Sequence, residues 1–386
     1  MTDHLAPTLA VIGGGQLARM MAQPAIALGL PLRLLAEAPG VSAAQVIPDH
    51  VVGDYRDLET LRQVTSGCPV VTFDHEHVPT QHLHALEDFG IAVRPGPEAL
   101  VHAQDKAVMR ARLSGLGIPC PRHTIVTTPD EVASFGFPAV LKTSRGGYDG
   151  KGVWTVGSVA ECSEPFATAS TAGVQVLAEE LVDFRRELSA LVVRSPSGQA
   201  AAYAVVESTQ VDGICREVVA PAPGLEPELA GEAQQIALKI AGELGVTGIL
   251  AVELFETTDG RILVNELAMR PHNTGHWTQD GAVTSQFENH LRAVMDLPLG
   301  SPAARARWTV MVNILGGAVG SGRLWDGFPH AMARDPRLRV HLYGKELRPG
   351  RKVGHVNAYG DDLDDCLERA RHAAAWFRGD LGNESE

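Results

Sequence analysis

Residues 262–277, ILVNELAMRPHNTGHW, restrict the fold and function that this chain can have more than any other stretch does. An apolar run leads into Asn265 and Glu266, and a second polar group follows at Arg270, His272 and Asn273. Binding and catalytic sites commonly contain several charged and hydrogen-bonding side chains within so short a stretch. A strand with a polar turn after it is the simpler interpretation. The cluster favours a metal–phosphate site beside a small anionic substrate.

The preceding residues predict the strand that pairs with this stretch. Residues 247–267, TGILAVELFETTDGRILVNEL, indicate an antiparallel hairpin with its turn at Asp259-Gly260. Glu253 lies in the first strand and Glu266 in the second, each among apolar neighbours where an unpaired carboxylate is costly to bury. A shared cation, Mg²⁺ held together with nucleotide phosphates, explains both. The alternative is two strand-end acids that face water.

A glycine-rich loop earlier in the chain indicates a phosphate site. Residues 137–156, FPAVLKTSRGGYDGKGVWTV, predict two short strands around the loop, which Lys142 and Lys151 bracket. Backbone N–H groups flanked by ammonium groups suit a polyphosphate. No GKS or GKT helix start follows, so this is not a Walker A loop. A hairpin without a ligand is the alternative.

Residues 174–193 predict two further strands, the first ending at Glu179-Glu180 and the second beginning near Glu187. Strands that connect domains in this way can present backbone groups to an adenine edge and a carboxylate to ribose hydroxyls. From composition alone, these glutamates would be surface acids.

The N-terminal part predicts a parallel α/β sheet that extends to about residue 103. The pattern Gly13-x-Gly15-x-x-Ala18, with a strand at 8–13, a helix from Gln16 to Leu28 and a second strand ending in Glu37, fits a dinucleotide fold. Taken alone it indicates an NAD enzyme, although a tight glycine turn also serves close strand–helix packing. A strand at 69–73 is followed by Asp74-His75-Glu76-His77, which could bind a metal but is more often an exposed polar loop.

The remaining segments predict further helices, strands and a basic turn. We expect helices at 80–88, 104–117, 226–244 and 282–295, a strand at 308–315, a linker at 316–329 and a fraying polar helix at 361–386. A dense basic patch lies on a Gly- and Pro-containing turn and is a candidate monophosphate site. A solvated turn is the alternative. The patch comprises Lys345, Arg348, Arg351, Lys352 and His355.

Bulk properties exclude several classes of protein. The 386-residue chain has a formal net charge of −13 and no basic run, so we expect no nucleic-acid binding. No window approaches the roughly 18 apolar residues of a membrane span, and we expect no signal peptide. The five cysteines are odd in number and form no CxxC motif, which indicates reduced thiols in a cytoplasmic protein.

Four motifs together resemble the ATP-grasp superfamily and, within it, the family of N5-carboxyaminoimidazole ribonucleotide synthetases. They are GGGQLARM, KTSRGGYDGKG, NELAMRPHNTGHWT and KELRPGRKVGH, of which the last two are specific to the family. The resemblance implies an α/β and α+β fold in three parts. A Rossmann-like pre-ATP-grasp domain spans 1–103, an ATP-grasp domain spans 104–315 with a glycine-rich lid at about 120–178, and a small C-terminal domain spans 316–386.

The resemblance also implies the reaction. Bicarbonate, ATP and 5-aminoimidazole ribonucleotide would give N5-carboxyaminoimidazole ribonucleotide, ADP and phosphate through carboxyphosphate, in de novo purine biosynthesis. The ligase would be a homodimer and need Mg²⁺, with Mn²⁺ as a substitute. The opening glycine turn would serve the ribonucleotide rather than NAD.

The resemblance assigns site residues in four groups. The ATP-binding residues would be Lys106, Lys142, Gly147, Tyr148, Asp149, Gly150, Lys151, Gly152, Val153, Glu179, Glu180, Leu181, Val182, Glu187, Gln210, Asn265 and Glu266. The metal ligands would be Glu253 and Glu266. The catalytic residues would be Arg270, His272, Asn273, Tyr148 and Asp149, with His272 as a possible proton shuttle. The ribonucleotide would contact Gln16, Glu76, Arg270, Lys345, Arg351 and Lys352.

Three positions depart from the family pattern. Gln210 stands where a His is common, Lys106 where Arg is usual, and Met269 where Pro is common. Lys for Arg keeps the charge and loses the planar fork. Two rival classes stay open: an NAD-dependent oxidoreductase, which leaves the lid glycines unexplained, and a nucleotide-binding regulatory module without turnover. Intact Glu253, Glu266 and Lys142 argue against the second. His276 and Trp277 are expected only to pack around the turn.

Overall fold

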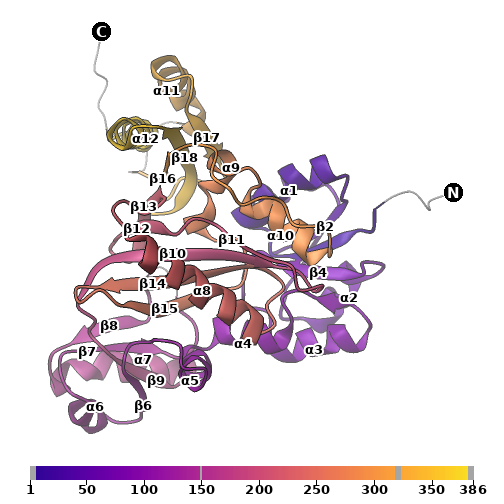
Figure 1. Ribbon diagram of the computed structural model, residues 1–386. Helices are drawn as coiled ribbons and strands as arrows, with labels where there is room; N and C mark the ends of the chain where they lie inside the picture. The colour runs from indigo at the N-terminus through magenta and orange to yellow at the C-terminus, as the bar shows by residue number, and fades with distance from the viewer. Residues whose placement is uncertain (1–5, 148–149, 318–322, 381–386) are drawn as a thin grey trace.

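The computed structural model describes residues 6–147, 150–317 and 323–380 (Figure 1). These residues form three sheets, of five, nine and four strands. Figure 1 shows the five-stranded sheet and the four-stranded sheet at opposite sides of the nine-stranded one, with α11 and α12 at a third end. Within the described part of the chain, no helix is both long and apolar enough to cross a membrane.

The N-terminal sheet is parallel throughout, as predicted, in the order β3-β2-β1-β4-β5. All residues of β1 and β4 are buried, because helices cover both faces of such a sheet. Its strands are β1 Leu9–Ile12, β2 Leu32–Ala36, β3 His50–Val52, β4 Val70–Phe73 and β5 Ala92–Val93. Its helices are α1 Gln16–Leu28, α2 Leu58–Thr65 and α3 Thr80–Asp88.

Carboxylates bind the backbone donors at the start of α1. Asp74 accepts hydrogen bonds from Gly15 N at 3.1 Å and Ala18 N at 2.7 Å, and Glu37 accepts one from Gly14 N at 2.9 Å. A dinucleotide phosphate would need these same N–H groups. The glycine turn therefore serves strand–helix packing, which weighs against the NAD interpretation.

The central sheet has the order β15-β14-β10-β12-β13-β16-β18-β17, with β11 paired to β10. Helix α8 (Pro227–Glu243) packs against β10 and β14, and α10 (Gln286–Val294) packs against both β14 and α1. The strands are β10 Phe184–Arg194, β11 Ala200–Ala202, β12 Val206–Val211, β13 Ile214–Ala220, β14 Gly248–Thr257, β15 Ile262–Ala268, β16 Trp308–Leu315, β17 Arg339–Leu342 and β18 Lys352–Gly360. The predicted hairpin is confirmed as β14 and β15, and Glu253 lies directly opposite Glu266.

The four-stranded antiparallel sheet, which we call the lid sheet, has the order β6-β9-β7-β8. The predicted strands around the glycine loop are confirmed as β7 and β8. The sheet and its covering helices comprise β6 His123–Val126, α6 Pro129–Phe135, β7 Ala139–Thr143, β8 Val153–Val156, η1 Val159–Cys162, α7 Ser163–Ala172 and β9 Val176–Glu180. The next strand, β10, begins at Phe184, which is three residues before the predicted start near Glu187.

The predicted helix at 104–117 is confirmed as α5 (Lys106–Gly115), and a separate helix that was not predicted, α4 (Pro97–Gln104), precedes it. Asp105 lies between them in an extended conformation and caps α5 by accepting hydrogen bonds from Ala107 N and Val108 N. An aspartate with free backbone donors after it favours a helix start, which explains the break.

The C-terminal part differs most from the sequence-based expectation. Part of the predicted linker at 316–329 is helical, with η3 (Leu324–Gly327) and the start of α11 (Phe328–Arg334). The predicted fraying helix is instead α12 (Leu363–Arg378), which packs against β16 and β18. Its buried face includes Cys366, Ala370 and Phe377. The fraying prediction was therefore wrong for residues 363–378.

Candidate active site

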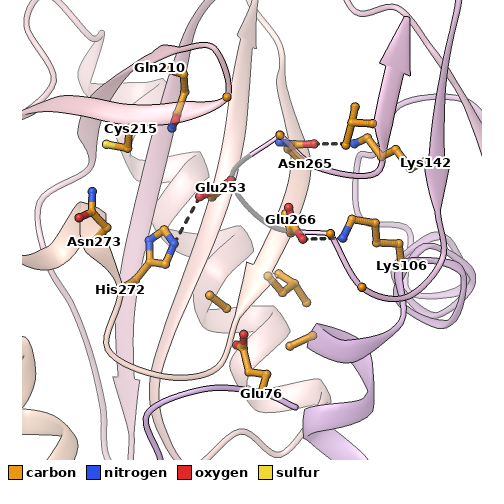
Figure 2. Close-up of a pocket in the computed structure, with 18 of the residues that line it drawn as sticks. Glu76, Lys106, Lys142, Gln210, Cys215, Glu253, Asn265, Glu266, His272 and Asn273 are labelled. Carbon is orange, nitrogen blue, oxygen red and sulfur yellow. Dashed lines mark hydrogen bonds and ion pairs between the residues drawn. The ribbon is translucent and has the colours of Figure 1, made fainter. Parts of the chain in front are cut away.

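A cleft of about 920 Å³ lies between the lid sheet, the β14–β15 hairpin and the N-terminal sheet (Figure 2). Most of the residues predicted for the site line it. They are Gln16, Glu76, Lys106, Lys142, Gly147, Gly150, Val153, Glu179, Glu180, Leu181, Val182, Glu187, Gln210, Glu253, Asn265, Glu266, Arg270, His272, Asn273 and Lys352. Lys151, Gly152, Lys345 and Arg351 are not among the lining residues, and Tyr148 and Asp149 lie outside the described residues.

The cross-strand pair Glu253 and Glu266 faces this cleft. Glu266 Oε1 lies 2.8 Å from Lys106 Nζ, and Glu253 Oε1 lies 3.4 Å from His272 Nε2. Burial raises the pKa of Glu253 to about 8, and the negative charges of Glu266 and Glu187 add to the effect. Two carboxylates that repel each other in this way favour a cation between them.

The donor set at this pair fits Mg²⁺ bound to a nucleotide. Among the described residues, no group of three or more His, Cys, Asp or Glu side chains could hold a metal alone. Mg²⁺ characteristically takes one or two carboxylates and completes its shell with phosphate oxygens and water. Asn265, beside Glu266, adds an amide oxygen that also accepts from Lys142 at 3.1 Å.

A closed ring of contacts lies beside the carboxylate pair. Glu179 accepts from Lys142 Nζ through Oε2 at 2.7 Å and from Arg110 Nε through Oε1. Arg110 also donates to the carbonyl oxygens of Val264 at 2.9 Å and Asn265 at 2.8 Å. We call Arg110, Glu179, Lys142 and Asn265 the phosphate-end ring.

Glu179 is not the surface acid that composition alone suggests. Glu179 is buried, with only 2% of its surface exposed. Burial alone would raise the pKa of Glu179, but the charges of Lys142 and Arg110 outweigh it and hold the pKa at about 2. The sequence-based assignment missed Arg110, although its position one helical turn after Lys106 placed it on the same face of α5.

His272 is held as a neutral imidazole. His272 Nδ1 lies 2.8 Å from Thr274 Oγ1 and 3.4 Å from the donor Thr274 N, an arrangement that favours the tautomer with its proton on Nε2, facing Glu253. Burial lowers the pKa of His272 well below its usual value, and the charges of Arg270 and Lys352 lower it further. Next to it, both amide atoms of Asn273 lack a protein hydrogen-bond partner. Asn273 lines the cleft, and its amide also interacts with the Cys215 thiol.

Glu76 connects the N-terminal sheet to the polar turn after β15. It accepts hydrogen bonds from Met269 N at 2.6 Å and from Arg270 Nε at 3.2 Å. Asp74, two residues earlier, caps α1 as described above. Asp74 and Glu76 accept hydrogen bonds from other elements of the fold, which argues against the metal site that residues 74–77 could have formed. Glu76 is therefore also not an exposed loop residue without contacts.

The predicted basic patch at 345–355 divides into separate environments. Lys345 donates to Gln16 Oε1 at the edge of the cleft, and Lys352 lines the cleft itself. Arg348 lies at the surface, 2.8 Å from Glu346. His355 is fully buried, bonded to Tyr343, and burial lowers its pKa well below the usual value. The prediction was therefore wrong for His355, and for the four Lys and Arg side chains it stays a prediction.

The lid loop requires glycine and touches the central sheet. Gly147, Gly150 and Gly152 have φ of +81°, +78° and +72°, which disfavour other residues. A Cβ on Gly150 would lie 3.2 Å from the Cα of Gly213, in the turn that follows Gln210. The loop thus packs directly against the β12–β13 turn.

The last residues of the opening stretch pack in the core, as expected. His276 is 0% exposed and Trp277 is 1% exposed. Gln286 Nε2 contacts His276 Nδ1 at 3.0 Å, and the Trp277 ring meets Tyr203 edge-on. The five cysteines are all free thiols, also as expected.

Three family models match the chain in sequence. A ribonucleotide synthetase preATP-grasp domain matches residues 6–104, an ATP-grasp domain matches 111–287, and a phosphoribosylaminoimidazole carboxylase C-terminal domain matches 309–369. They follow one another in the order of the three predicted parts. The predicted boundaries at 103/104 and 315/316 stay predictions.

Curated proteins and solved structures are similar over nearly the whole chain. N5-carboxyaminoimidazole ribonucleotide synthase of Mycobacterium tuberculosis (strain H37Rv) is 55% identical over 98% of this chain and 89% of its own length. The crystal structure of an ADP complex of N5-carboxyaminoimidazole ribonucleotide synthetase aligns with a TM-score of 0.88 at 35% identity, covering 99% and 100% of the two chains. The Aspergillus clavatus enzyme, in complex with ADP and 5-aminoimidazole ribonucleotide, aligns with a TM-score of 0.86 at 30% identity, covering 96% and 98%.

Proposed function

The chain belongs to the N5-carboxyaminoimidazole ribonucleotide synthase family, and from that premise we propose how its residues carry out the ATP-dependent carboxylation of 5-aminoimidazole ribonucleotide. The protein is an ATP-dependent ligase of purine biosynthesis. The single observation that supports the assignment of its residues is the Glu253–Glu266 pair, which faces one cleft together with Lys106 and Lys142.

ATP binds at the lid end of the cleft. Lys106 and Lys142 hold its phosphates, and backbone N–H groups of the loop at 147–153 cover them. The segment from Glu179 to Val182 lies along the adenine, with Glu179 acting through its ion pairs, and Glu187 takes the ribose hydroxyls. Gln210 donates or accepts one further hydrogen bond. Tyr148 and Asp149 complete the loop by family resemblance.

Magnesium, or manganese in its place, would be held by Glu253 and Glu266 with help from Asn265. Such an ion neutralises phosphate charge and so favours attack on the γ-phosphorus. The raised pKa of Glu253 supports this assignment, because an added cation would relieve the repulsion between the two carboxylates.

Bicarbonate binds between Arg270, His272 and Asn273. Its oxygen attacks the γ-phosphorus of ATP, the bond to the β-phosphate oxygen breaks, and carboxyphosphate and ADP form. Lys142 stabilises the charge spread over the transferring group. The exocyclic amine of the ribonucleotide then attacks the carboxyl carbon and displaces phosphate, and the departing phosphate takes up the proton that the amine loses. Because the pKa of His272 is depressed, we assign it a hydrogen-bond donor role at Nε2 rather than that of a cationic acid.

The ribonucleotide occupies the other end of the cleft. Lys345, Arg351 and Lys352 would bind its phosphate, and Gln16 and Glu76 its ribose and amine side. Closure of the lid sheet over both ends would exclude water, which otherwise hydrolyses carboxyphosphate. Lys345 and Arg351 do not line the cleft themselves, but Lys345 donates to Gln16, which does.

The test is product formation with purified protein. ADP release should require both bicarbonate and 5-aminoimidazole ribonucleotide, and Glu266→Gln should reduce it by at least about 10³-fold, as loss of charge stabilisation in a transition state does. ADP release that depends on formate or an amino acid would assign the chain to another ligase. Quenching of nicotinamide fluorescence on mixing would revive the oxidoreductase class.

Homodimer formation is proposed from the family resemblance, and cytoplasmic location from the free cysteines. Sedimentation velocity at micromolar concentration tests the first, and a monomer would contradict it.

A further inference from the structure

We propose that Arg110 is a positioning residue for ATP: it touches no substrate, but through Glu179 and the β15 backbone it fixes Lys142 and the Asn265–Glu266 segment. This inference rests on the proposed function of the cleft. Arg110 is 0% exposed and is not among the residues that line the cleft, so any effect on ATP must pass through other residues.

The two oxygens of Glu179 are divided between two cations. Arg110 takes Oε1, and Lys142 takes Oε2 at 2.7 Å. An ammonium has three protons. Lys142 directs one to Glu179 and one to Asn265 Oδ1, which leaves the third for a phosphate oxygen. Without Arg110, the buried carboxylate would have Lys142 as its remaining ion-pair partner and would draw the ammonium away from ATP.

The guanidinium also fixes the backbone just before a proposed metal ligand. Arg110 donates to the carbonyls of Val264 and Asn265, two consecutive residues of β15 that precede Glu266. A planar guanidinium presents its donors in a rigid fork, so these bonds specify both distance and orientation. On the same helix, Lys106 reaches the Glu266 carboxylate itself at 2.8 Å. Helix α5 therefore orients this segment of β15 through two hydrogen bonds to its backbone and one ion pair with a side chain.

The phosphate-end ring joins three parts of the fold. Glu179 and Lys142 belong to the lid sheet, Asn265 to the central sheet, and Arg110 to the helix between them. A role in stability alone would require only that the buried charges be paired. The additional bonds to the β15 carbonyls indicate a role in geometry, and that role predicts a specific effect on ATP rather than a general loss of active protein.

The experiment compares Arg110→Met with a matched control on the same helix, Arg112→Met. Arg112 is exposed and 3.8 Å from Glu243. Losses of residues that orient ligand-binding groups typically cost about 10- to 100-fold in affinity or activity. We expect Arg110→Met to raise KM for ATP, and Kd for ATP by calorimetry with Mg²⁺ present, by about that factor, with KM for the ribonucleotide within about twofold of wild type. Arg112→Met should leave all three unchanged.

Arg110→Lys distinguishes geometry from charge and remains informative if the Met variant does not fold. It keeps the ion pair with Glu179 and loses the fork, so KM and Kd for ATP should lie between those of wild type and Arg110→Met. The proposal is overturned if folded Arg110 variants bind ATP as wild type does, or if both substrates are affected equally. Failure of the wild type to carboxylate the ribonucleotide would instead refute the proposed function.

Discussion

Glu179 and Glu253 are glutamates on strands that border the same cleft, yet their surroundings shift their pKa values in opposite directions. Two protein cations hold the pKa of Glu179 at about 2. Burial and two neighbouring carboxylates raise the pKa of Glu253 to about 8. The protein thus neutralises the first carboxylate internally and leaves the second to be neutralised by something else.

The opposite pKa shifts distinguish a carboxylate that stabilises the fold from one that is available to bind a ligand. A buried carboxylate that is already paired with protein cations gains little further stabilisation from a bound ligand. A buried carboxylate that repels neighbouring carboxylates is stabilised much more by a bound cation. Glu179 therefore acts on ATP through the geometry of Lys142. Glu253 is available for a cation that arrives with the nucleotide. Three changes test this contrast, beginning with the largest expected effect.

Glu179→Gln should destabilise the folded protein strongly. It leaves the charges of Arg110 and Lys142 buried without their common partner, which typically costs about 3–5 kcal/mol. The pKa of Glu179 is depressed in the folded state, so its contribution is present above pH of about 4.5 and is lost as the pH falls toward about 2. Urea unfolding at pH 7 measures the loss, and the wild-type and variant stabilities should converge below pH 4.5.

A loss below about 1 kcal/mol at pH 7 would contradict the internal pairing of Glu179. Glu243→Gln, which removes a half-exposed carboxylate at the surface, provides the control and should change the free energy of unfolding little.

Glu253→Gln should have the opposite pH dependence. The folded pKa of Glu253 is raised, so the folded protein binds this proton more tightly than the unfolded chain does. Its ionisation therefore costs stability as the pH rises from about 4.5 to about 8, and glutamine avoids that cost. In thermal unfolding without metal or nucleotide, the melting temperature of Glu253→Gln relative to wild type should increase by a few degrees from pH 5 to pH 8.

Adding Mg²⁺ with ATP at pH 8 should stabilise the wild type more than Glu253→Gln. Equal stabilisation of the two proteins would mean that Glu253 does not hold the metal. A relative melting temperature that falls between pH 5 and pH 8 would show that burial does not raise the pKa of this carboxylate.

Lys106→Arg should have the smallest effect. Lys106 lies 2.8 Å from Glu266 and occupies a position where the family usually has arginine. The substitution keeps the charge and restores a planar fork, so kcat and KM for ATP should stay within about threefold of wild type. Steady-state ADP release measures both constants. A loss near that of Glu266→Gln would mean that the site depends on a compact ammonium.

Local patterns were sufficient to predict the parts of the fold that depend on neighbouring residues. The turn at Asp259-Gly260 predicted the hairpin of β14 and β15, but the opposition of Glu253 and Glu266 also depends on the register shift between Glu253 and Leu254, which the turn alone does not predict. The parallel N-terminal sheet followed in the same way from apolar runs separated by helical segments.

Distant pairing could not be predicted. Arg110 finds Glu179 at a sequence separation of 69 residues and Val264 at 154, and no local pattern carries that information. His355 belongs to a locally basic motif, but the pairing of β18 between β16 and β17 buries it. The buried face of α12 is made largely of alanine, which gives a weak apolar signal.

The β-bulges of the central sheet have a consequence for the span of the cleft. Glu253 on β14 and Lys352 on β18 have β10, β12, β13 and β16 between them, so a flat sheet would separate them by about 24 Å. Glu253 and Lys352 nevertheless line the same cleft, which indicates that the sheet curls around it.

Bulges bend strands in this way, and register shifts occur at Glu253/Leu254, Thr209/Gln210 and Ile314/Leu315, the last opposite Lys352. Each lies beside a residue that lines the cleft. Single extra residues of the strands therefore help to set which side chains reach the cleft on either side of each bulge. Deleting the extra residue Asn265 would shift the pairing of β15 by one residue and turn the side chains beyond the bulge to the opposite face of the sheet.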